Sequence, residues 1–207
     1  MAKAARFEFF CPRSFQCLLA VALLFAAPPT HAADPEFDAV TGYRISRYRS
    51  PVPETVPSGT RITAAEINDL VKMHDAVLID VMPSDGAGLD TGTGQWRMSK
   101  PRQDIPGSVW LPDVGKGQIS QALETYFKSN LKSLTASNPA RAVILYCQSD
   151  CWMSWNAVQR AASFGYTSLY WFPEGSDGWR DWDGNFAEAI PVPVVPGVTS
   201  ATRAPVP

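Results

Sequence analysis

Short apolar runs alternate with helical patterns of apolar residues along the middle of the chain. The apolar runs cover residues 76–81, 108–111, 142–146 and 168–171 and predict strands, and the runs at 76–81 and 142–146 are typical of strands buried on both faces. Apolar residues recur at intervals of three and four over residues 63–74, 120–134 and 152–164, which predicts helices. This alternation predicts an α/β fold with a central parallel sheet and helices on both faces.

Residues at the element ends support this assignment. Thr63 and Glu66 have the spacing of a capping box at the start of the first helix, and Gly165 is placed as the C-terminal cap of the third. Residues 83–104 are rich in glycine and predict a long loop. That loop lacks the lysine and the residue order of a phosphate-binding loop, which argues against a nucleotide site.

Residues 1–32 have the pattern of a secretory signal peptide. A basic start precedes an uncharged apolar run of 11 residues at 17–27, and small residues lead to a cleavage site after Ala32. We therefore expect an exported, periplasmic protein, with no membrane segment after cleavage. Cleavage would remove Cys11, Cys17 and His31 and leave two cysteines in an oxidising compartment.

The mature chain divides into three parts by composition. Residues 33–59 form an arm rich in proline, tyrosine and arginine, residues 60–187 the folded domain, and residues 188–207 a proline-rich tail that we expect to be extended or disordered. The arm is interpreted either as an extended segment lying on the domain or as a surface for docking a partner.

Charge and composition narrow the function classes. The chain has 18 basic and 20 acidic residues, and this mild acidity gives no electrostatic footprint for nucleic acid. Two histidines are too few for most histidine-based metal sites. We expect no cofactor.

Candidate chemistry centres on the remaining cysteine pair. Cys147 directly follows a predicted strand and Cys151 comes at the start of the next helix, where ligands and chemistry collect in open α/β sheets. A helix N-terminus favours a thiolate, whereas Asp150 between the cysteines opposes it. No lysine or arginine lies between residues 142 and 159, so any further activation has to come from backbone amides or from residues distant in sequence.

The spacing of the pair suits a disulfide. The ring it would close is small and stabilises the fold little, which favours a reversible dithiol over a structural bridge. A purely structural disulfide, two unrelated buried thiols and a soft-metal site for Cu(I), with Met153 as a further sulfur ligand, remain as alternatives. The buried Asp80 at the end of the first long strand either bonds loop amides or moves a proton.

Five segments in order resemble the rhodanese domain: 78–81, 105–109, 143–147, 164–166 and 175–179. The resemblance implies an α/β fold in which Cys147 stands at the position of the cysteine that carries a persulfide. The stretches TGYRISRYRSPVP, IPGSVWLPDVGKG and CWMSWN more closely resemble the periplasmic "PQQ-dependent catabolism-associated CXXCW motif" proteins, although three residues rather than two separate the cysteines here. That resemblance implies a partner in quinoprotein-linked alcohol oxidation, either a quinoprotein dehydrogenase or a c-type cytochrome.

Two departures from ordinary rhodaneses bear on activity. Trp152 stands where an arginine usually closes the loop, and Met82 replaces another frequent arginine. An indole cannot bind an anionic sulfur donor as a guanidinium does, which argues against thiosulfate turnover.

We therefore expect thiol–disulfide or sulfur-carrier chemistry, with Cys147 as the attacking or persulfide-bearing sulfur and Cys151 as the resolving one. The residues expected to bind substrate or partner are Gln148, Ser149, Asp150, Trp152 and Asp80. The alternatives are a non-catalytic accessory module and a Cu(I)-handling protein. Three later tryptophans, Trp171, Trp179 and Trp182, are expected to border the same mouth.

Overall fold

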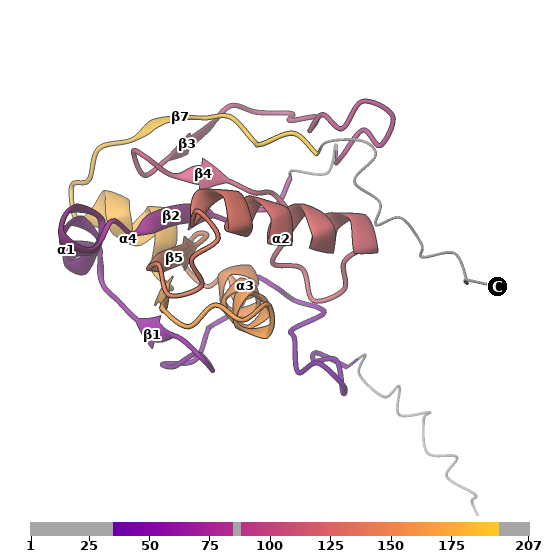
Figure 1. The fold of residues 1–207 in the computed structure, drawn as a ribbon, viewed down its shortest axis with the longest axis horizontal. Helices are drawn as coiled ribbons and strands as arrows, with labels where there is room; N and C mark the ends of the chain where they lie inside the picture. The colour runs from indigo at the N-terminus through magenta and orange to yellow at the C-terminus, as the bar shows by residue number, and fades with distance from the viewer. Residues whose placement is uncertain (1–34, 85–87, 195–207) are drawn as a thin grey trace, which may run out of the picture. The chain divides into compact units, whose positions relative to one another are not determined.

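The computed structural model describes residues 35–84 and 88–194. The predicted signal peptide and most of the predicted tail therefore lie outside the described residues. The strands are β1 (Thr60–Arg61), β2 (Val77–Asp80), β3 (Arg102–Asp104), β4 (Val109–Trp110), β5 (Val143–Tyr146), β6 (Leu169–Phe172) and β7 (Ala187–Ala189). The helices are α1 (Ala64–His74), α2 (Gln121–Leu134), α3 (Trp152–Ser163) and α4 (Gly175–Asp181) (Figure 1).

Five strands form a parallel sheet in the order β1-β6-β5-β2-β4, which confirms the predicted α/β class. The central strand β5 pairs with β2 on one side and β6 on the other, so that Leu145 lies opposite both Ile79 and Trp171. All carboxyl ends of these strands consequently meet at one edge of the sheet.

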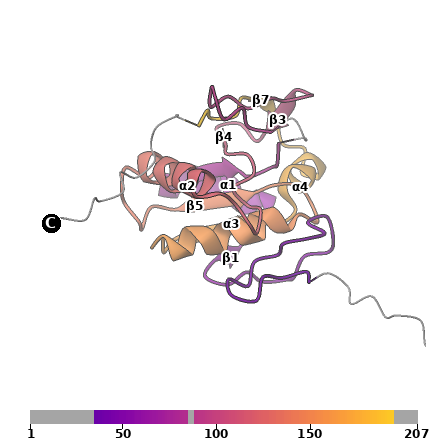
Figure 2. The same cartoon turned by 90° about the vertical axis from the view of Figure 1, so that its right-hand side faces the viewer.

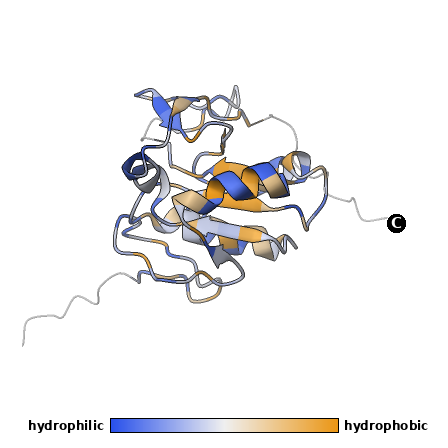
Figure 3. Cartoon of the chain, turned by 90° about the vertical axis from the view of Figure 1, so that its left-hand side faces the viewer, coloured by the Kyte–Doolittle hydropathy of each residue, from blue (hydrophilic) through white to orange (hydrophobic). Residues whose placement is uncertain are grey.

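Helices cover both faces of this sheet, as predicted. Alternate strand residues such as Ile79 and Leu145 face α2 and α3, and the residues between them, such as Leu78 and Ile144, face α1 and α4. Strands β2 and β5 are buried at every residue, and the hydropathy colouring shows strongly hydrophobic segments in the sheet (Figure 3). Burial on both faces explains why the strands have continuous rather than alternating apolar runs.

The predicted helix ends are also found. The Glu66 carboxylate accepts hydrogen bonds from the backbone N–H of Thr63 (2.8 Å) and from its hydroxyl (2.7 Å) at the start of α1. Gly165 follows α3 with a φ of 96°, a left-handed conformation that favours glycine.

Several elements differ from the prediction. The segment 83–104 is not loop throughout, because its end forms β3, which pairs antiparallel with β7. The short strand β1 and the helix α4 were not predicted. Val192 of the predicted tail donates its N–H to the Trp110 carbonyl (3.0 Å), so the described start of the tail lies along the domain.

The N-terminal arm runs along α3 (Figure 2). Asn156 on α3 binds both the N–H and the carbonyl of Arg44 (2.9 Å each), and Trp155 donates its indole N–H to the Thr55 carbonyl (3.0 Å). The arm had two interpretations, and the structure shows the first, an extended segment lying on the domain. Within residues 35–84 and 88–194, no helix has the length and apolarity required to cross a membrane.

Candidate functional site

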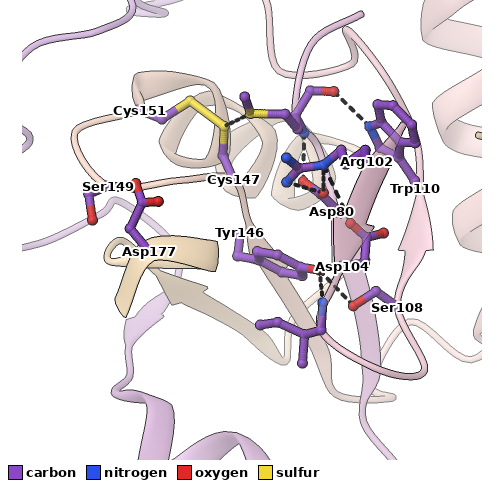
Figure 4. Close-up of polar contacts among 12 residues, drawn as sticks. Asp80, Arg102, Asp104, Ser108, Trp110, Tyr146, Cys147, Ser149, Cys151 and Asp177 are labelled. Carbon is purple, nitrogen blue, oxygen red and sulfur yellow. Dashed lines mark hydrogen bonds and ion pairs between the residues drawn. A yellow bond between two sulfur atoms is a disulfide. The ribbon is translucent and has the colours of Figure 1, made fainter. Parts of the chain in front are cut away.

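The two cysteines meet where the sheet and a helix adjoin. Cys147 directly follows β5, and Cys151 is the N-cap residue of α3. They form a disulfide with a Cα–Cα separation of 6.3 Å, within the range that a bridge tolerates (Figure 4). Bringing the two sulfurs together was predicted from the sequence, and the structure confirms it.

The disulfide is buried. Cys147 is wholly inaccessible and Cys151 is 2 % exposed. The thioether sulfur of Met82 lies 3.4 Å from the sulfur of Cys147. Met82 is therefore the candidate for a third sulfur ligand beside the two cysteines. The sequence analysis had assigned that place to Met153.

The loop between the cysteines is held by α4 and the residue before it. The Cys147 carbonyl accepts a hydrogen bond from Ser176 N–H (3.0 Å), and Gln148 forms an antiparallel bridge with Gly175. Ser149 N–H donates to the Asp177 carboxylate (3.1 Å), and its hydroxyl donates to the Glu174 carbonyl (2.9 Å). One loop amide is thus already bound to a carboxylate of the same chain.

Gly175→Ala is expected to lower the free energy of unfolding by about 3 kcal/mol and to displace the cysteine loop. Gly175 has a φ of 54°, and a Cβ there would lie 2.6 Å from the Cys147 carbonyl oxygen. Gly107→Ala is the matched control, because Gly107 also has a positive φ but its Cβ would meet no atom within 4 Å. Denaturant unfolding measures both variants, and equal losses would show that the close approach of Gly175 to the loop is unimportant.

A buried ionic cluster lies beside the disulfide. The Asp80 carboxylate accepts a hydrogen bond from Met82 N–H (2.8 Å) and binds Arg102 from β3 (2.6 Å to Nε, 2.5 Å to a terminal nitrogen). Asp104 of β3 lies 3.4 Å from the same Arg102 Nε. Asp80 therefore bonds a loop amide, which was one of the two sequence interpretations, and also pairs with a cation that was not predicted (Figure 4).

Two carboxyl groups share one arginine in this cluster. Burial raises the pKa of Asp80 well above its ordinary value, with Arg102 opposing and Asp104 adding to the shift. Burial likewise raises the pKa of Asp104. Since one guanidinium balances only one carboxylate, we expect the pair to hold a proton more readily than isolated carboxyl groups do.

Tyr146 extends the ionic cluster towards the face of the sheet that α1 and α4 cover. Its hydroxyl accepts a hydrogen bond from Ile105 N–H (3.2 Å) and shares another with the Ser108 hydroxyl (2.7 Å). Burial raises the pKa of Tyr146, with the charges of Asp80 and Asp104 adding to the shift. The phenol is therefore neutral and positions the segment around residues 105–108.

The arm reaches the cysteine loop as a strand does. Arg49 forms an antiparallel bridge with Cys151, Trp152 N–H donates to the Tyr48 carbonyl (3.0 Å), and Ser50 N–H donates to the Asp150 carbonyl (3.1 Å). Asp150 is exposed and has a φ of 52°. The first amide of α3, at Trp152, is thereby bound to a carbonyl of the arm.

The tryptophans lie near the cysteine loop in a different combination from the one predicted. Trp152 is 8 % exposed and packs edge-on against Phe37 and Trp155, with its indole N–H donated to the Pro51 carbonyl (3.1 Å). The expectation that three later tryptophans border the cysteine mouth is wrong for Trp179 and Trp182, whereas Trp171 packs in the same buried cluster as the two cysteines. Trp171 is fully buried, and Trp179 and Trp182 line a separate hollow of about 300 Å³ beside α1.

Sequence reasoning missed the distant cation Arg102 and its partner Asp104. The available signal was a pair of opposite charges at residues 102 and 104, immediately before the Ile-Pro-Gly turn. Among the residues the structure describes, no group of three or more histidine, cysteine or acidic side chains is placed to hold a metal ion.

The fold and site define a class: a parallel α/β domain with a cysteine-containing loop at the carboxyl end of its central strand. The family model for the rhodanese-like domain matches residues 63–181, more than half of the chain. The chain therefore belongs to the rhodanese-like domain family, which confirms the family part of the resemblance. None of the curated proteins matches this sequence significantly.

Solved structures of related fold have low sequence identity. Thiosulfate sulfurtransferase from Pseudomonas aeruginosa is 16 % identical with a TM-score of 0.44, and the match covers 65 % of this chain and 22 % of that chain. The polysulfide-sulfur transferase homodimer from Wolinella succinogenes is 14 % identical with a TM-score of 0.40, covering 71 % and 85 %. The rhodanese-like domain of an Anabaena protein is 15 % identical with a TM-score of 0.41, covering 71 % and 86 %. This chain thus spans about a fifth of the first protein's length.

Proposed function

We propose that the protein performs dithiol–disulfide exchange through Cys147 and Cys151. The observation that carries this proposal is the pairing of the two sulfurs at the N-terminus of α3. Two amides that could face an anionic sulfur donor are bound elsewhere, Ser149 N–H to Asp177 and Trp152 N–H to Tyr48. With the loop arginine also replaced, the site favours sulfur-to-sulfur exchange over turnover of a small anion.

The structure supports a different division of roles from the one expected from sequence. Cys151 is the N-cap of α3, where the helix dipole and the first-turn amides beyond Trp152 stabilise a thiolate. Cys147 is the more deeply buried sulfur, in contact with Met82. We therefore assign Cys151 as the sulfur that bonds to the partner and Cys147 as the resolving sulfur.

The exchange transfers two electrons from the partner dithiol to the disulfide. One thiolate of a partner dithiol attacks the Cys151 sulfur, the bond to Cys147 breaks, and its electron pair stays on Cys147, which takes up a proton. The second partner thiolate then attacks the partner's sulfur in the mixed disulfide and releases Cys151 as a thiolate. The partner leaves as a disulfide, and the same steps run backwards when the protein is the reductant.

Equilibration in glutathione redox buffers, followed by alkylation and site-resolved mass spectrometry, tests the proposal. We expect Cys147 and Cys151 to titrate together, as one two-electron couple, while the protein stays folded. The variant with both cysteines replaced by serine supplies the background from Cys11 and Cys17. A bridge that is reduced only under denaturing conditions would contradict the proposal.

We extend this proposal to an exported protein whose partner belongs to quinoprotein-linked alcohol oxidation, a quinoprotein dehydrogenase or a c-type cytochrome. The signal-peptide pattern of residues 1–32 and the resemblance to the CXXCW motif proteins support it. Growth on alcohols tests the partner in alcohol oxidation together with the exchange chemistry. Loss of growth with both cysteines replaced by serine supports exchange chemistry, whereas unchanged growth favours a non-catalytic accessory module.

Cu(I) handling is a second candidate function, supported by the position of Met82. Once the disulfide is reduced, two thiolates and a thioether 3.4 Å from one of them form a three-sulfur set of the kind that Cu(I) prefers. We expect Met82→Leu to weaken Cu(I) binding to the reduced protein about tenfold in competition with bicinchoninate. Met153→Leu is the control, and equal effects of the two variants would count against this function.

A further inference from the structure

The segment Tyr48–Ser50, called the strap below, pairs with the cysteine loop through its backbone. The Tyr48 carbonyl accepts from Trp152 N–H (3.0 Å), and Ser50 N–H donates to the Asp150 carbonyl (3.1 Å). Arg49 lies opposite Cys151 and donates from its guanidinium to the Ser149 carbonyl (2.8 Å). The cysteine loop thus presents a strand-like edge that the arm occupies.

Exchange cannot start from this arrangement. A thiolate has to approach the sulfur roughly along the S–S bond, and the sulfurs belong to residues that are 0 % and 2 % exposed, Cys147 and Cys151. Some segment beside Cys151 must therefore move before a partner sulfur can reach it. One side of the loop is bound to the segment 174–177 of the domain. The opposite side is bound by the strap, at Cys151 and its neighbours.

The strap is suited to leave while the rest of the arm stays. The arm is anchored upstream by Arg44 on Asn156 and downstream by Thr55 on Trp155. Between these anchors, the two bonds from Tyr48 and Ser50 to the loop use backbone groups that any extended segment possesses. Two side chains of the strap add to them: the Arg49 guanidinium binds the Ser149 carbonyl, and the Tyr48 hydroxyl accepts from Gly117 N–H (3.0 Å). A second extended chain could therefore make the same backbone bonds in place of the strap.

We propose that the strap closes the exchange site in cis and that the partner is a protein that displaces it with an extended segment carrying its reactive cysteine. This inference rests on the proposed function. The Ser149 carbonyl, which the Arg49 guanidinium binds, suits a partner segment with an arginine or lysine at the place that Arg49 has in the strap. The partner thereby forms its bonds to the loop and exposes Cys151 in one step.

Ser50→Pro and Ser50→Ala form the matched pair that tests the strap. Proline removes the N–H that binds Asp150, whereas alanine keeps it, and both lose the hydroxyl that contacts Arg44. We expect tris(2-carboxyethyl)phosphine to reduce the bridge of the proline variant about tenfold faster than that of the alanine variant. A synthetic peptide of residues 43–55 should slow the proline variant again and leave the alanine variant unchanged.

Equal and measurable rates in two folded Ser50 variants would overturn the strap and leave the proposed function intact. If the bridge of neither variant is reduced under native conditions, both the strap and the proposed function fail. Should the proline variant not fold, Arg49→Ala against Arg47→Ala gives the same comparison, because Arg47 pairs with Glu36 and not with the loop. We expect about threefold faster reduction with Arg49→Ala, and equal rates there would equally overturn the strap.

Discussion

Arg102→Ala is expected to lower the free energy of unfolding by about 3–5 kcal/mol at neutral pH, measured by denaturant unfolding. The side chain is 15 % exposed and is the cation held between Asp80 and Asp104. Its removal leaves two buried carboxyl groups without a counter-charge, and it also removes the guanidinium 5.7 Å from the Trp110 ring. An unpaired buried charge is more destabilising than the intact pair is stabilising, which is why the expected loss is large.

Arg97→Ala is the control for this prediction. Arg97 also pairs with an aspartate, Asp90, but its side chain is 69 % exposed, so we expect a loss of at most about 1 kcal/mol. Losses of equal size in the two variants would contradict a special role for the buried cluster.

The loss on replacing Arg102 should also depend on pH. Burial raises the pKa of both aspartates, and removing the opposing guanidinium raises the pKa of Asp80 further. The folded variant then binds protons more tightly than the unfolded chain, so its stability falls as pH rises above the ordinary carboxyl range. We therefore expect a smaller loss at pH 5 than at pH 8, and a loss that does not change with pH would show that the carboxyl groups are not its cause.

The sequence predicted the parts of the fold that bury apolar side chains. The central strands β2, β5 and β6 have continuous apolar runs because both of their faces are covered, and α2 and α3 have one apolar face each. The ladder of β3 and β7 was missed because its strands are three residues long and mostly polar or small. Helix α4 was missed because its seven residues include two glycines, which ordinarily weaken a helix.

The candidate site was predictable where neighbouring residues form it. Cys147 and Cys151 share one strand-to-helix turn, so the topology of a parallel sheet was enough to bring them together. The contributions of Arg102, Met82 and the strap depend on pairing between segments far apart in the chain. Such pairing is set by tertiary packing, and no local periodicity in the sequence reports it.

The two single cysteine variants should differ strongly in their reaction with glutathione disulfide. We expect Cys147→Ser, which leaves Cys151 free at the N-cap of α3, to form a mixed disulfide about 10–100 times faster than Cys151→Ser. The reason is that the helix N-terminus raises the thiolate fraction of Cys151, whereas the remaining thiol of Cys151→Ser, Cys147, is wholly buried beside Met82. Intact-protein mass spectrometry over time measures both rates, with the double serine variant as the background from Cys11 and Cys17.

The order of these rates separates the two assignments of roles. A faster Cys151→Ser would return the attacking role to Cys147, as its place in the rhodanese-like loop implies, and would mean that the loop amides stabilise charge more than the helix N-terminus does. A faster Cys147→Ser places the partner's sulfur on the residue that the strap covers. In that case one feature, the start of α3 at Cys151, explains three others. It sets where the thiolate forms, which side of the loop the strap closes, and why the resolving sulfur is the more deeply buried one.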